Sequence, residues 1–175
     1  MQAPPGLIPD APVPGCECWY RLLTNTDYVT REGTVHYQAL KGKVFKAPQE
    51  RKPWAHELSG QLASLADIRN EAEVAVQRIH EGYIQRGQTI PSKMLFTGVA
   101  CALARELRTV IADIRPTDIV YSPLPTDRAH SNFVTYQTAS DEDLDPVRHW
   151  LMKTLRVIKP QDIEVRIASC GQASG

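Results

Sequence analysis

Residues 64–87, with the sequence SLADIRNEAEVAVQRIHEGYIQRG, carry the clearest helical periodicity in the chain. Apolar residues recur there every three or four positions, which is the spacing of one face of an α-helix. They are Ile68, Ala72, Ala75, Ile79 and Tyr83. Ser64 is the expected N-cap because Asp67 follows three residues later, as in a capping box. Arg86 places a cation in the last turn and Gly87 a glycine after it, so we predict an amphipathic helix between Ser64 and Gly87.

Two more amphipathic helices are expected further along the chain. The first covers Gly98–Ile114 and ends ahead of Pro116, because a proline disfavours helical backbone in the residue before it. Its apolar stripe is Val99, Leu103, Leu107, Val110, Ile111 and Ile114. The second begins at Ser140 or Asp145, and Pro146 suits its first turn. Its apolar stripe is Leu144, Val147, Leu151, Leu155 and Ile158.

Short runs of β-branched and aromatic residues predict strands around these helices. The expected strands are Cys18–Leu23, Thr34–Tyr37, Ile119–Tyr121, His130–Tyr136 and Ile163–Ile167, with a short edge strand around Val44–Phe45. Gly33 allows a turn with positive φ ahead of Thr34–Tyr37, which favours a hairpin there. The sequence thus predicts an α/β or α+β domain, in which a small mixed sheet of four to five short strands packs with three amphipathic helices.

The N-terminal residues differ in composition from the rest of the chain. Five prolines lie within residues 1–15, and the segment shows no apolar periodicity. Since proline lacks a backbone N–H, such a segment cannot form a continuous hydrogen-bond ladder, and we expect almost none of it to be buried. We therefore predict a flexible tail over residues 1–15, a single globular domain over residues 16–170 and a short flexible tail over residues 171–175.

Composition and charge exclude some classes of protein. The chain has 175 residues, of which 42% are hydrophobic, and its 20 Lys and Arg balance 20 Asp and Glu. Nucleic-acid binding draws on basic residues that neutralise phosphates, so this balance disfavours a nucleic-acid partner. We find neither a signal peptide nor an apolar run long enough for a membrane helix. The four cysteines show no disulfide framework, and we expect free thiols in a soluble, cytoplasmic protein.

Motifs for metal or cofactor binding are missing from the sequence. It contains neither a G-x-x-x-x-G-K-[ST] loop nor a G-x-G-x-x-G turn, and its five histidines lack the i, i+4 spacing of a zinc protease. Residues 141–145 are acidic but do not have the pattern of a calcium loop. These carboxylates instead favour the N-terminal end of the last predicted helix. We expect no metal site and no cofactor.

The strongest catalytic candidate is the segment 121–130, YSPLPTDRAH. It follows a predicted strand, and ligands of open α/β sheets gather beyond strand ends. Asp127 supplies a carboxylate, Arg128 a fixed cation and His130 an imidazole that titrates near neutral pH, and all three types serve acid–base chemistry. The alternative is a proline-stiffened connection whose polar groups hydrogen-bond its own backbone. The sequence favours this second interpretation.

A second candidate surface lies in the basic segment that precedes the first helix. Its residues are Lys41, Lys43, Lys46, Arg51, Lys52 and Trp54. Cations beside an aromatic side chain are typical of protein-binding surfaces. A solvated edge of the sheet, with Trp54 packed into the core, explains the same residues.

Two functions are compatible with these patterns. The first is a small accessory protein that binds a partner protein through the basic segment and Trp54, or through its tail. The alternative is a small hydrolase- or transferase-type enzyme, with Asp127 and His130 as acid–base groups and Arg128 as an anion-binding residue. The absence of a catalytic signature favours the first.

Overall fold

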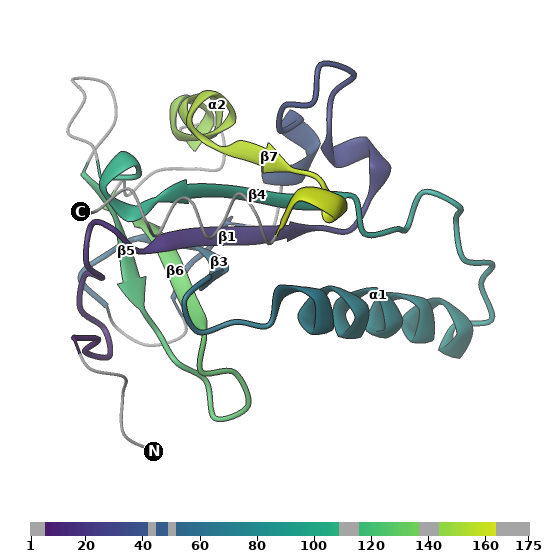
Figure 1. Cartoon of the computed structure of the whole chain (residues 1–175), viewed down its shortest axis with the longest axis horizontal. Coiled ribbons are helices and arrows are strands. Elements are labelled where there is room, and N and C mark those ends of the chain that lie inside the picture. Colours follow the sequence, from purple (N-terminus) through teal and green to yellow (C-terminus); the bar gives the residue numbers. More distant parts are fainter. Residues whose placement is uncertain (1–5, 42–44, 49–51, 109–115, 137–143, 164–175) are drawn as a thin grey trace.

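The protein is built on one antiparallel sheet (Figure 1). The computed structural model describes residues 6–41, 45–48, 52–108, 116–136 and 144–163. These residues form seven strands and two α-helices, and the sheet order is β5-β6-β3-β1-β4-β7, with β2 beside β3. The strands are β1 Cys18–Leu23, β2 Phe45–Lys46, β3 His56–Leu62, β4 Gly98–Leu103, β5 Thr117–Tyr121, β6 His130–Thr135 and β7 Arg156–Ile158. The prediction of four to five strands with three helices is therefore wrong, although the mixed α/β class holds.

The largest error concerns the predicted helix Gly98–Ile114. Its first six residues form β4, which pairs with β1 over its whole length and with β7 on its other side. Every residue of β4 is buried, because both faces of the sheet are covered here. A strand buried on both faces is a continuous apolar run, and such a run matches helical spacing as readily as strand spacing. The end of the predicted helix, residues 109–114, lies outside the described residues.

Two further strands are absent from the sequence-based prediction. β3 pairs with β6 along one edge and with both β1 and β2 along the other, so it lies at the centre of the sheet. It contains a glycine and four polar residues, which obscure the alternation of Leu58, Gly60 and Leu62 on one face. β7 follows the last helix after a single residue, Leu155, and the predicted apolar stripe of that helix continues through β7 to Ile158.

Other expectations are confirmed. β1 has the predicted bounds, and β5 and β6 lie within one or two residues of theirs. Gly33 adopts a φ of 79° in the predicted turn, although a single bridge between Val29 and Val35 replaces the hairpin strands. The predicted strand Ile163–Ile167 lies outside the described residues except for Ile163.

Both helices begin close to their predicted positions, and the first also ends close to its predicted end, whereas the last ends at Thr154, before Leu155 and Ile158 of its predicted stripe. Helix α1 covers Ile68–Gln85 and is capped by Asp67, whose side chain accepts a hydrogen bond from the N–H of Asn70. Ser64, the predicted N-cap, instead donates to Glu17. At the C-terminal end, the N–H groups of residues 87 and 88 bond back to residues 84 and 83 in a Schellman arrangement. Helix α2 covers Asp145–Thr154.

The helices cover opposite faces of the sheet (Figure 1). Helix α2 packs on the face that carries Trp19, through the buried residues Val147 and Leu151. Helix α1 packs on the other face, but only Ile68 and Ala72 of its 18 residues are buried. The rest of α1 runs beyond the sheet, with most of its surface in solvent.

Helix α2 is also fixed by a buried arginine. Arg148 is 1% exposed, and its guanidinium donates to the Leu40 carbonyl and to Asp145, both at 2.9 Å. The Tyr37 hydroxyl donates to the same Asp145 oxygen at 2.5 Å. The Tyr37 bond, and then Arg148, lower the pKa of Asp145. The acidic residue expected only to favour the helix terminus therefore also holds the helix to the chain around residue 40.

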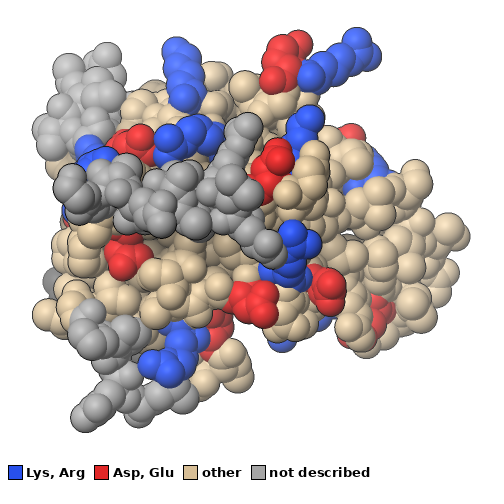
Figure 2. All heavy atoms as spheres, in the orientation of Figure 1, with Lys and Arg blue, Asp and Glu red and all other residues tan. Residues whose placement is uncertain are grey.

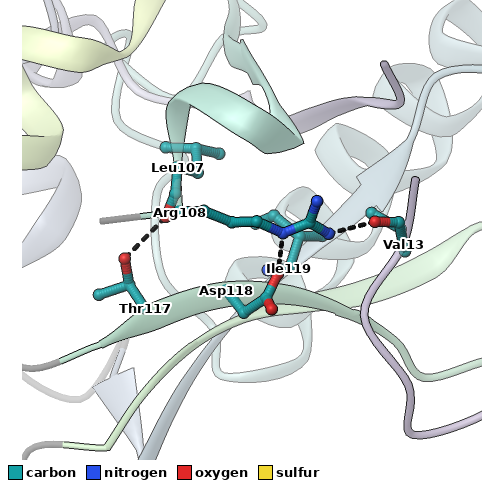
Figure 3. A network of polar contacts seen from close by, with 6 residues as sticks. All are labelled: Val13, Leu107, Arg108, Thr117, Asp118 and Ile119. Atoms are coloured by element: carbon teal, nitrogen blue, oxygen red, sulfur yellow. Dashed lines mark hydrogen bonds and ion pairs between the residues drawn. The ribbon is translucent and has the colours of Figure 1, made fainter. Parts of the chain in front are cut away.

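The N-terminal segment makes more contacts than its composition suggests. Leu7 and Val13 are buried in the same cluster as Trp19, and residues 10–13 exchange backbone hydrogen bonds with β5. Figure 3 shows how Arg108 joins this segment to the sheet: its guanidinium donates to the Val13 carbonyl and pairs with Asp118 at 2.6 Å. The expectation that almost nothing is buried here is wrong for residues 6–15. The domain boundary predicted at residue 16 stays a prediction, and these contacts favour an earlier start.

At the centre of the sheet, the indole of Trp19 lies directly against the backbone of Gly60. A Cβ atom added at Gly60 would come within 2.3–2.5 Å of three ring atoms of Trp19, and Trp19 is fully buried. Close packing leaves the ring no space into which it could move. Because the Trp19 ring on the neighbouring strand occupies the space of a side chain, only glycine fits at position 60.

We predict that Gly60→Ala lowers the free energy of unfolding by about 1–3 kcal/mol, the usual cost of overpacking a core. Chemical denaturation of the purified protein measures this change. Gly82→Ala is the matched control, because Gly82 lies within α1 and a Cβ there meets only the flexible end of Arg86. It should raise stability by about 0.5–1 kcal/mol through helix propensity. Equal effects of the two substitutions would contradict the packing described for Trp19.

A second prediction concerns the N-terminal segment. A chain that starts at Gly15 should melt at least about 5 °C lower than the full chain, because it loses the buried side chains of Leu7 and Val13. Deletion of residues 1–5 alone, which keeps both side chains, should leave the thermal midpoint unchanged. If the two truncated chains melt together with the parent, the segment does not contribute to stability.

Candidate functional site

The predicted catalytic segment is a tight connection between β5 and β6. Leu124 and Asp127 exchange two backbone hydrogen bonds of 2.9 and 3.1 Å, which close the turn. The Asp127 carboxylate accepts from the N–H of Ala129 at 3.0 Å and from the side chain of Gln61, on β3, at 3.1 Å. Both oxygens of Asp127 therefore hold the connection in shape and tie it to the sheet.

His130 is oriented by the same connection. Its Nδ1 lies 2.6 Å from the carbonyl oxygen of Ser122. Because a carbonyl only accepts, Nδ1 carries the proton, and Nε2 keeps its lone pair in the neutral ring. The hydroxyl of Tyr121 donates to the carbonyl of Arg128.

The three predicted catalytic residues are thus close in sequence but do not form one catalytic unit. Among the hydrogen bonds of the described residues, none joins Asp127 to His130. A catalytic base is normally oriented by a partner such as a carboxylate, and here that carboxylate bonds to Gln61 and Ala129 instead. These contacts support the alternative interpretation of a self-braced connection. A catalytic role for Asp127, Arg128 and His130 stays a prediction.

The residues of the basic segment lie in different environments in the structure. Lys41 and Lys46 are exposed, whereas Lys43 and Arg51 lie outside the described residues. Lys52 pairs with Asp10 at 2.5 Å and lies 5.9 Å from the ring of Trp54. Trp54 itself is 4% exposed and packs with Val120 and Val134 against the sheet. The tryptophan therefore contributes to the core more than to any surface, although binding by this segment stays a prediction.

A buried tyrosine–carboxylate pair lies next to the catalytic candidate. Tyr20, on β1, donates its hydroxyl to Glu71 in the first turns of α1. Burial raises the pKa of Tyr20, and the bond to Glu71 raises it further. Burial also raises the pKa of Glu71; the Tyr20 bond opposes this rise, and the charges of Asp127 and Asp67 add to it. No sequence pattern indicates this pair, because Glu71 is off the apolar stripe and Tyr20 is 51 residues away.

A groove beside α1 is open to solvent. It has a volume of about 620 Å³ and lies between α1 and residues 95, 96 and 160. Its lining residues are Arg69, Ala72, Glu73, Val76, Gln77, His80, Glu81, Ile84, Leu95, Phe96 and Pro160. Two large apolar side chains in it are exposed to solvent, Ile84 at 64% and Leu95 at 51%.

Charged residues of both signs surround the groove. Figure 2 shows blue and red residues interspersed on the viewed face, including the right-hand part where α1 lies in Figure 1, and Arg69, Glu73 and Glu81 line the groove itself. Exposed apolar residues that lie together in a groove with a polar rim are typical of a protein-binding surface. The groove is not evident from the sequence, because Leu95, Phe96 and Pro160 meet α1 only in the folded chain.

Other kinds of site find no support in the described part of the chain. It holds no cluster of three or more His, Cys, Asp or Glu side chains that could bind a metal ion. Within the same residues, neither helix is both long and apolar enough to span a membrane. Comparisons with protein-family models, curated proteins and solved structures find no match for this chain.

The Tyr20–Glu71 pair leads to a prediction about pH. The raised pKa means that the folded state holds the Glu71 proton more tightly than the unfolded state does. Glu71 therefore favours folding at low pH, and this contribution is lost as pH rises through the raised pKa. Glu71→Gln removes the titration but keeps an oxygen that accepts from Tyr20.

We expect the urea midpoint of the parent to fall, relative to that of Glu71→Gln, as the pH rises from about 4, near the ordinary pKa of a glutamate, through the raised pKa of Glu71. Glu81→Gln, on the exposed side of the same helix, is the control and should follow the parent. Parallel pH profiles for the parent and Glu71→Gln would show that the Glu71 carboxyl is not buried enough to matter.

Proposed function

We propose that this protein is a protein-binding module that receives an amphipathic helix of a partner protein in the groove beside α1. The observation that carries the proposal is the exposure of Ile84 and Leu95 in one groove. Leaving such side chains in water is unfavourable, and covering them with an apolar helix face would favour association. The basic segment with Lys41 and Lys46 stays a second predicted binding surface.

The dimensions and charges of the groove favour a helix as its occupant. From Arg69 to Ile84 the lining follows four turns of α1, about 22 Å at the rise of an α-helix. The rim carries Arg69 at one end and Glu81 at the other. A helix with apolar residues at i, i+4 and i+7, an acidic residue near Arg69 and a basic one near Glu81 would complement both the apolar floor and these charges.

The enzyme is the second candidate, and one observation favours it. The bond between Nδ1 of His130 and the Ser122 carbonyl fixes the ring and leaves a lone pair on Nε2, as a general base requires. The carboxylate that would orient such a base is engaged elsewhere. The geometry therefore supports the binding module better.

The proposal is tested with a display library of helical peptides. The peptides carry leucine at i, i+4 and i+7, with random charged residues at both ends, and are selected on the full chain. We expect binders with a Kd below about 100 μM, enriched in an acidic residue at one end and a basic residue at the other. Fluorescence anisotropy of labelled peptides measures their affinity for the parent and its variants.

Substitutions in the groove show whether the peptides bind there. Ile84→Asp and Leu95→Asp should each weaken binding at least about tenfold, because each puts a charge on the apolar floor. Val74→Asp is the matched control: Val74 is exposed on α1 but does not line the groove. A selection without binders, or binders insensitive to both groove variants, would overturn the proposal. A dimer in light scattering that Ile84→Asp abolishes would mean that the occupant is a second copy of this chain.

A further inference from the structure

Two buried cysteines lie near each other on one face of the sheet, on the neighbouring strands β1 and β4. In the pairing of β1 with β4, Cys18 is opposite Leu103 and Cys101 is opposite Tyr20, so the two cysteines are diagonal neighbours. Residues opposite each other in a sheet share a face, and all four of these side chains belong to one apolar cluster. The Cys18 side chain is also the largest cause of the lowered pKa of Cys101. Neither cysteine is in a disulfide in the structure.

We propose that Cys18 and Cys101 form a redox site, in which the thiol pair closes to a cross-strand disulfide by exchange with a disulfide-containing oxidant such as oxidised glutathione. The inference is independent of the function proposed for the groove. It depends on the register of β1 and β4, which makes the two cysteines diagonal neighbours on one face of the sheet, and on the burial of both.

Access decides the order of the two exchange steps. Cys18 is 6% exposed at the first position of β1, whereas Cys101 is fully buried. The Cys18 thiolate attacks one sulfur of the oxidant RSSR, which forms a mixed disulfide and releases one RSH. The Cys101 thiolate then attacks Sγ of Cys18 and releases the second RSH. Two protein thiols are oxidised to one disulfide, and RSSR is reduced to two RSH, so atoms and electrons balance.

The surroundings of Cys101 favour its role in the second step. The hydrogen bond with Cys18 lowers the pKa of Cys101, burial opposes this, Arg156 lowers it and Glu106 raises it. Arg156 is opposite Cys101 on β7. Once Cys18 is in the mixed disulfide it no longer has an S–H to donate, and the charge of Arg156 still stabilises the attacking thiolate.

The diagonal arrangement makes the disulfide reversible. Diagonal neighbours in an antiparallel pair have Cα atoms about 7–8 Å apart, slightly more than an unstrained disulfide spans. Closure therefore requires β1 and β4 to shift slightly against each other, which is costly for two strands in a packed core. A strained disulfide is reduced easily, as is usual for regulatory disulfides.

The chain provides its own control for this chemistry. Cys16 is an exposed thiol two positions from Cys18, so it meets any oxidant in solution more readily. If exposure alone governed the reaction, Cys16 would be the main site of modification and would stay as a mixed disulfide. If the sheet geometry governs it, the product is a bond between Cys18 and Cys101.

The experiment exposes the folded full chain to oxidised glutathione, blocks the remaining thiols by alkylation and maps the peptides by mass spectrometry. We expect a peptide pair joined through Cys18 and Cys101, which dithiothreitol separates, in the parent and equally in Cys16→Ser. Cys101→Ala should instead accumulate the glutathione adduct on Cys18. Thermal melting confirms that each variant is folded before it is tested.

Three results would overturn the proposal. They are a stable glutathione adduct on Cys18 in the parent, a crosslink that joins Cys18 to Cys16 or Cys170 instead of Cys101, and modification of Cys16 alone while Cys18 and Cys101 stay reduced. Each would show that the register of β1 and β4 does not bring the two sulfurs into reaction.

Discussion

The contact between the Trp19 ring and the Gly60 backbone is the constraint around which the sheet is arranged. It lies where β1 meets β3, the two strands at the centre of the sheet order. The Trp19 ring, held in this position, packs against Phe133 and belongs to the same core cluster as the buried residues of α2. The other side of β1 carries Cys18 and Tyr20, so the same strand also sets the positions of the thiol pair and of the hydroxyl that bonds to Glu71.

Elements whose signal is local can be predicted from the sequence, whereas those defined by their neighbours cannot. β1 is a short run of aromatic and aliphatic residues and β5 a short run of β-branched and aromatic residues, and both predictions are confirmed. β4 matches the pattern of a helix because both faces of the sheet are covered along it, which removes the alternation that marks a half-exposed strand. β3 has no clear strand pattern because Gly60 lacks a side chain, so the alternation is broken where Trp19 needs space.

The candidate site shows the same difference between features with a local sequence signal and features that depend on the fold. Asp127, Arg128 and His130 stand out in the sequence, but only the fold shows that Asp127 bonds to Gln61 on β3. Trp54 stands out as well, and its burial follows from contacts with Val120 and Val134. The groove could not be predicted at all, because its walls come from three separate parts of the chain. Local patterns therefore identify polar residues, whereas the surface open to a partner depends on tertiary packing.

The position of the N-terminal segment on β5 has a consequence for the order in which the protein forms on the ribosome. Residues 10–13 are synthesised well before the strand they bond to, which begins at Thr117. β1 likewise waits for β4, its partner along its whole length, until residue 103 has left the exit tunnel. Contacts so distant in sequence form slowly and late. Until β4 is available, the nascent chain therefore carries its central strand without a full set of partners, which makes early association with a chaperone advantageous.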